Sequence, residues 1–87
     1  MTKSEFIFKL NSKNPIVKSC NTNNGWGFGG KVYVQYELHG FTVNIGRNCY
    51  RHAPSESFIS VWNMDKRILD QRPSSRVFDK AAILLGL

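Results

Sequence analysis

The alternation of apolar and polar side chains over Lys31–Asn48 is the feature that most restricts the fold of this chain. On each side of His39-Gly40 every second residue is apolar, and alternate residues of a strand lie on the same face. The pattern therefore predicts two β-strands joined by a two-residue turn at His39-Gly40. The pairs expected across this turn are Leu38 with Phe41, Tyr36 with Val43 and Val34 with Ile45.

The two faces of this predicted hairpin differ in polarity. The apolar face holds Val32, Val34, Tyr36, Leu38, Phe41, Val43 and Ile45. The other face, which suits water or a partner, holds Tyr33, Gln35, Glu37, Thr42 and Asn44. Because an isolated hairpin is only marginally stable in water, the flanking segments must cover the apolar face.

The residues before the hairpin favour a second, N-terminal hairpin. Alternation over Ser4–Leu10 predicts a first strand, with a short amphipathic helix starting at Ser4 as the alternative. On that strand the large apolar side chains of one face are Phe6, Phe8 and Leu10. Turn-forming residues follow at Asn11–Pro15, and Ile16–Cys20 is expected to return as a strand. Asn21–Gly30 is too rich in glycine and asparagine for a helix or a central strand, so it is expected to be a loop.

The segment after the hairpin begins with a polar connection over Cys49–Ser57. Phe58–Asn63 is short and rich in β-branched and aromatic residues, which favours a strand that extends the hairpin into a meander. A helix over Ser55–Asp70 is the competing interpretation. With the strand preferred, Met64–Arg72 is expected to be a turn or a short helical segment.

The C-terminal segment is the clearest helix. Ser74 or Ser75 suits its N-cap, Asp79 suits its positive first turn, and Gly86 suits its end. Its broad apolar stripe consists of Val77, Phe78, Ala81, Ala82, Leu84 and Leu85. We therefore expect a single α+β domain over residues 1–87. A small antiparallel sheet is built on the central hairpin (31–48), with this helix on its apolar face.

The charge balance points to an acidic partner. The chain contains twelve Lys and Arg and six Asp and Glu, which gives a formal net charge of +6, and the pI is about 9.7. Such a balance is compatible with nucleic acid, a nucleoprotein or an acidic protein. A basic and aromatic edge is expected where the Asn21–Gly30 loop meets the hairpin. Its candidate binding residues are Lys9, Lys13, Lys18, Trp26, Phe28, Lys31, Arg47 and Arg51.

Motifs for catalysis or cofactor binding are weak. Gly25–Gly30 matches G-x-G-x-x-G, but a strand follows it where the dinucleotide fingerprint needs a helix. Cys49-x-x-His52 has ligand-like spacing and Cys20 is a candidate third ligand, although both cysteines fit better as small apolar groups. No carboxylate pair and no oriented nucleophile stand out. We therefore expect no enzyme activity, no metal and no cofactor.

The expected function is that of a small, non-enzymatic binding protein that contacts nucleic acid through this basic and aromatic edge. The alternative is an inhibitor or adaptor, of the type found among phage and mobile-element accessory proteins, that docks on a larger host protein or nucleoprotein complex. Its anchors would be Trp26, Phe28 and Arg47. The sequence shows no signal peptide or transmembrane run, so a cytoplasmic location without membrane contact is expected. Exposed strand edges are candidates for pairing with a second copy.

Overall fold

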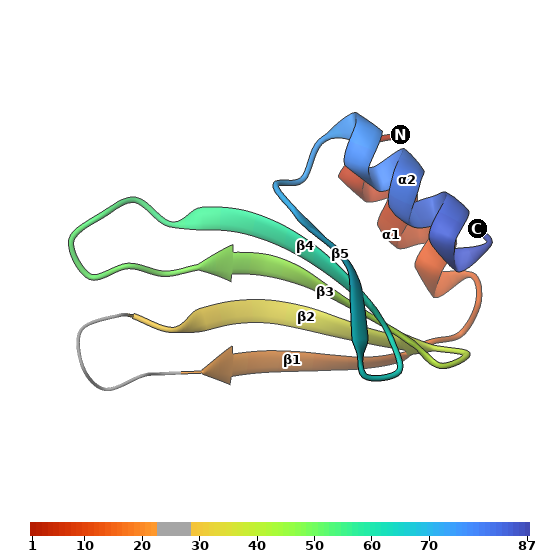
Figure 1. Ribbon diagram of the computed structural model, residues 1–87, viewed down its shortest axis with the longest axis horizontal. Coiled ribbons are helices and arrows are strands. Elements are labelled where there is room, and N and C mark those ends of the chain that lie inside the picture. The colour runs from red at the N-terminus through yellow and green to blue at the C-terminus, as the bar shows by residue number, and fades with distance from the viewer. Residues whose placement is uncertain (23–28) are drawn as a thin grey trace.

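The computed structural model describes residues 1–22 and 29–87 as a sheet with two helices. The elements are α1 (Lys3–Asn11), β1 (Ile16–Thr22), β2 (Lys31–Leu38), β3 (Phe41–Asn48), β4 (Glu56–Asn63), β5 (Lys66–Gln71) and α2 (Ser75–Leu85). The five strands form one antiparallel sheet in the order β1-β2-β3-β4-β5, which is also their order in the chain (Figure 1). This arrangement confirms the predicted α+β class built on a central antiparallel hairpin.

The central hairpin has the predicted register. Leu38 faces Phe41 across the turn, and the next pairs along the same face are Tyr36 with Val43 and Val34 with Ile45. His39 and Gly40 have φ angles of 48° and 84°. Positive φ at both central residues is what a tight two-residue hairpin turn requires.

The segment after the hairpin contains one more strand than predicted. Phe58–Asn63 lies within β4, as expected, but Met64–Arg72 contains β5 rather than a turn or a helical segment. The register shifts between Val61 and Trp62, which pair with Leu69 and Arg67, so Ile68 has no direct partner on β4. Because of this extra residue, two apolar side chains, Ile68 and Leu69, follow each other directly, which interrupts the alternation of apolar and polar residues that marks a strand. The prediction for Met64–Arg72 was therefore wrong.

The strand preferred over Ser4–Leu10 was also wrong, because this segment lies in helix α1, which was the alternative. Ile16–Cys20 lies in β1, as predicted. Thr2 caps the helix: its Oγ1 accepts a hydrogen bond from the Glu5 amide at 3.1 Å, and the Glu5 carboxylate accepts one from the Thr2 amide at 3.3 Å. Phe6 and Leu10 are fully buried, whereas Phe8 is 75% exposed. No N-terminal hairpin forms, and β1 pairs with β2 instead.

Helix α2 forms where the sequence predicted it. The Ser74 Oγ accepts a hydrogen bond from the Val77 amide at 3.3 Å, and Gly86 ends the helix with a φ of 72°. Asp79 lies beyond the first turn rather than in it. Its carboxylate instead accepts a hydrogen bond from the Met1 amino group at 2.6 Å, which connects α2 to the start of α1.

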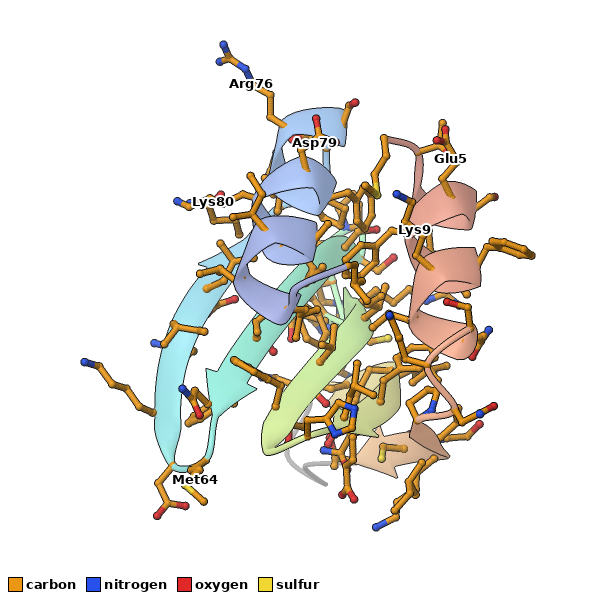
Figure 2. The ribbon with its side chains drawn as sticks, turned by 90° about the vertical axis from the view of Figure 1, so that its right-hand side faces the viewer. Glu5, Lys9, Met64, Arg76, Asp79 and Lys80 are labelled. Carbon is orange, nitrogen blue, oxygen red and sulfur yellow. The ribbon has the colours of Figure 1, made fainter. Side chains whose placement is uncertain are left out.

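The two helices pack on the same face of the sheet. Figure 1 shows them together over the end of the sheet near the β2–β3 turn, and Figure 2 shows α1 on the β1 side and α2 on the β5 side. The rings of Phe6 and Phe78 join them, with centroids 5.3 Å apart. The sheet residues buried in this core are Tyr36, Leu38, Val43, Ile45, Ile59, Val61 and Leu69. Neither of the two described helices is long and apolar enough to cross a membrane.

Candidate functional site

The sheet face opposite the helices, here called the open face, carries an unusual set of side chains. Directly paired residues of neighbouring strands lie on the same face, so the register identifies its members. They include Lys18, Cys20, Lys31, Tyr33, Gln35, Glu37, Thr42, Asn44, Gly46, Phe58, Ser60, Trp62, Arg67 and Asp70. Figure 1 shows both helices on the other side of the sheet, so none of the described helices covers this face.

Two aromatic side chains of the open face meet across a glycine. Gly46 on β3 pairs with Tyr33 on one side and with Phe58 on the other. The two rings lie edge to face, with centroids 6.0 Å apart. A Cβ at Gly46 would collide with the backbone carbonyl oxygen of Val32. Only glycine therefore fits here, and its missing side chain leaves the space in which the rings approach.

Each of two aromatic rings on this face has a cation above it. The Lys31 Nζ lies 5.3 Å from the centroid of the Phe58 ring, and the guanidinium carbon of Arg67 lies 5.9 Å from the Trp62 ring. Both distances are within the range of cation–π attraction. Phe58 is only 8% exposed, although none of the described helices covers it. Its neighbours on the open face itself, including Lys31 and Tyr33, therefore shield it from water.

A shallow hollow of about 110 Å³ lies among these groups. Asn44 and Ser60 pair directly in the middle of the sheet, between Phe58 and Trp62. The Asn44 Nδ2 donates a hydrogen bond to the Ser60 Oγ at 3.4 Å, but the buried Asn44 Oδ1 has no partner within residues 1–22 and 29–87. A buried acceptor left unpaired costs about 1–3 kcal/mol. An unpaired buried acceptor in a folded protein calls for an explanation. One explanation is a ligand that donates a hydrogen bond to the Asn44 Oδ1.

The remaining charges of the open face are paired and exposed. Lys18 lies 3.5 Å from Glu37, and Arg67 lies 3.0 Å from Asp70. Exposed pairs of this kind contribute about 0–1 kcal/mol each, so their cations are free to exchange a carboxylate for another anion. Burial, and then interaction with Cys20, raises the pKa of the Tyr33 phenol, which keeps the ring neutral. The face thus combines neutral aromatic rings with exchangeable cations.

The structure separates the predicted binding lysines. Lys18 and Lys31 lie on the open face. Lys9 lies on α1 and Lys13 follows that helix, shortly before β1. Because β1 begins opposite Glu37, near the β2–β3 turn, these two lysines lie at the end of the sheet away from Lys31. The expected adjacency of Lys9 and Lys13 to the hairpin entrance is therefore not found.

The predicted arginines lie near Lys31 but not on the same face. Arg47 pairs with Val32 at the Lys31 end of the hairpin, as expected, yet on the helix side of the sheet. There it lines a groove of about 460 Å³. The lining of this groove also includes Lys3, Val32, Val34, Ile45 and Ser57. Arg51 is exposed in the connection between β3 and β4. Trp26 and Phe28 lie outside the described residues.

The two cysteines are free thiols. Cys20 lies on β1 and Cys49 follows β3. In residues 1–22 and 29–87, no three His, Cys, Asp or Glu side chains come close enough to hold a metal ion. The candidate set of Cys20, Cys49 and His52 therefore does not assemble.

Sequence reasoning missed three residues of this face, namely Phe58, Trp62 and Arg67. The signal was present for two of them, because Phe58 and Trp62 alternate with the core residues Ile59 and Val61. A strand with apolar side chains on both faces indicates that its second face is also shielded from water. No protein-family model, curated protein or solved structure matches this chain.

Proposed function

We propose that this chain is a non-enzymatic protein that binds single-stranded nucleic acid on the open face. The observation that supports the proposal is the set of Tyr33, Phe58 and Trp62 on a face that none of the described helices covers, with Lys31 and Arg67 over two of the rings. Aromatic side chains on such a platform stack with bases, and neighbouring cations neutralise phosphates. The net charge of +6 adds long-range attraction.

A single strand fits this surface better than a duplex. Bases in a duplex already stack on one another, whereas those of a single strand can be splayed out onto protein rings. The hollow of about 110 Å³ is small, so it suits one ring system at a time. In the bound state the Lys31 ammonium group leaves the ring of Phe58 and contacts a phosphate, which makes room for a base.

The charges around the hollow select the sign of the ligand. A cationic ligand, such as a methylated ammonium group, would need an aromatic cage with an available carboxylate. Here two cations, Lys31 and Arg67, lie over the rings of the hollow, whereas Asp70 supplies its one carboxylate among the described residues. An aromatic ligand that carries negative charge is therefore the better match.

The same proposal places the protein in the cytoplasm, a reducing compartment in which Cys20 and Cys49 stay as free thiols.

Fluorescence anisotropy with labelled single-stranded DNA, single-stranded RNA and a DNA duplex tests this function. We expect the single strands to bind more tightly, with an affinity that falls as salt rises by a logarithmic slope of about 0.7 per phosphate contacted. Trp62→Ala should weaken binding roughly 5- to 150-fold, which corresponds to the loss of one stacked base at about 1–3 kcal/mol. Trp62→Phe should retain most of the affinity.

Two double variants that remove the same charge distinguish binding by the open face from binding by the net positive charge of the chain. The double variant Lys31→Ala/Arg67→Ala should lose affinity and lower the salt slope, whereas Lys9→Ala/Lys13→Ala removes the same charge elsewhere and should bind nearly as the wild type does. Circular dichroism confirms that each variant is folded. Equal losses in the two double variants, or no binding by the wild type at low salt, would show that the proposed function is wrong.

A further inference from the structure

The two edges of the sheet differ in how well they are protected against pairing with another strand. The order β1-β2-β3-β4-β5 leaves β1 and β5 as the edges. Strand β5 carries three charged side chains in six residues, Lys66, Arg67 and Asp70, and its register with β4 is irregular. Charges and bulges of this kind are the usual means by which proteins prevent edge-to-edge association.

Strand β1 is less protected, because it has no bulge and carries one charged side chain instead of three. All seven of its residues pair with β2 in unbroken register. Its one charged side chain, Lys18, is balanced by Glu37 at 3.5 Å. Ile16 and Val17 are 60% and 50% exposed. The far side of β1 thus carries a regular row of backbone donors and acceptors that none of the other described strands pairs.

We infer that β1 pairs antiparallel with β1 of a second copy of this chain, around a two-fold axis. The register that pairs all seven residues of both strands places Ser19 on this axis. It pairs Ser19 with Ser19, Lys18 with Cys20, Val17 with Asn21 and Ile16 with Thr22. Such an interface is isologous, because both copies contribute the same surface.

The charge of β1 favours this register over its neighbour. With Ser19 on the axis, each Lys18 faces an uncharged Cys20. A slip of one residue is excluded because it places side chains of opposite faces against each other. A slip of two residues toward Ile16 puts Lys18 on the axis, where the two ammonium groups would face each other directly and repel. The single charge of the strand therefore disfavours the register centred on Lys18, whereas the register centred on Ser19 pairs all seven residues.

The pairing would also align the open faces of the two copies. Directly opposed residues of an antiparallel pair lie on the same face. Lys18 and Cys20 both belong to the open face, so the two open faces would lie side by side on one continuous sheet. This inference does not depend on the proposed function, because the dimer can be tested without nucleic acid.

Sedimentation velocity over a range of protein concentrations tests the dimer. We expect the wild type to reach twice the chain mass of 9.9 kDa. Ser19→Lys places two ammonium groups face to face on the axis and should weaken the dimer at least ~10-fold. Gln71→Lys adds the same charge at the exposed β5 edge and should leave the dimer intact. Circular dichroism confirms that both variants are folded.

A cross-linking experiment tests the register itself, in a background that carries Cys20→Ser and Cys49→Ser. Opposed residues of an antiparallel pair have Cα atoms about 4.5–5.5 Å apart, within the range of a disulfide. Ser19→Cys should therefore form an intermolecular disulfide on mild oxidation, whereas Thr22→Cys, far from the axis, should not. A wild type that stays at 9.9 kDa, equal dissociation by Ser19→Lys and Gln71→Lys, or equal cross-linking at both positions would overturn the inference.

Discussion

At the scale of single residues, the side-chain amide of Asn44 stands out on the open face because its hydrogen bonding within the described residues is incomplete. Among the described residues its Oδ1 is buried without a partner, and the only hydrogen bond of the side chain is the 3.4 Å contact to the buried Ser60. Removing both partners of a weak buried polar pair is often neutral or stabilising, whereas removing one leaves the other unpaired. Asn44 and Ser60 therefore suit a double-mutant cycle.

We expect the double variant Asn44→Val/Ser60→Ala to be more stable than the wild type by about 1 kcal/mol, since no buried polar atom of the pair then lacks a partner. Ser60→Ala alone should lower the free energy of unfolding, because both polar atoms of the Asn44 amide would then be unpaired. Urea unfolding of the four proteins in the cycle measures these differences. A double variant less stable than Ser60→Ala alone would contradict this explanation of the amide.

At the scale of elements, local signals decided which predictions held. The β2–β3 hairpin was predictable in register because alternation and the His39-Gly40 turn agree. Strand β5 was not, because its register shift conceals the period of two. Alternation also misled at the N-terminus, where Phe6, Phe8 and Leu10 fit a strand, but the Thr2–Glu5 capping box starts a helix before the pattern begins.

The two phenylalanines of α1 distinguish the helix from the strand experimentally. A strand would place Phe6 and Phe8 on the same face, whereas the helix buries Phe6 against Phe78 and leaves Phe8 75% exposed. Phe6→Ala should therefore lower the free energy of unfolding by about 3–5 kcal/mol. Phe8→Ala, the matched control, should change it by less than about 0.5 kcal/mol. Similar losses in urea unfolding for the two variants would contradict the packing of α1.

At the scale of the whole molecule, the site could be predicted only in part, because it forms across strands that are distant in sequence. Lys31 and Tyr33 were identifiable from the hairpin alone, since its register fixes their face. Trp62 and Arg67 join them only when β4 and β5 extend the sheet. Charge counting grouped Lys9 with Lys18 along the chain, but α1 carries Lys9 to the other side of the sheet. Proximity in sequence was thus a poor guide to the shared surface.

The raised pKa values of Tyr36 and Tyr33 predict how the stability of the fold responds to alkaline pH. Burial raises the pKa of Tyr36 above its ordinary value of 10.0, and burial is also the main cause of the raised pKa of Tyr33. A phenol whose pKa is higher in the folded state favours folding while it is protonated. The stability that it contributes is therefore fully present below pH 10.0 and is lost as pH rises through the folded pKa.

Tyr36→Phe tests this linkage, because it keeps the ring in the core and removes the ionisable group. We expect the free energy of unfolding of the wild type to fall above pH 10.0 and that of Tyr36→Phe to fall less steeply. Tyr50→Phe, at a side chain that is 42% exposed, is the control and should follow the wild type. Urea unfolding on both sides of pH 10.0 measures the slopes. If Tyr36→Phe loses stability as steeply as the wild type, deprotonation of Tyr36 is not what limits the fold at high pH.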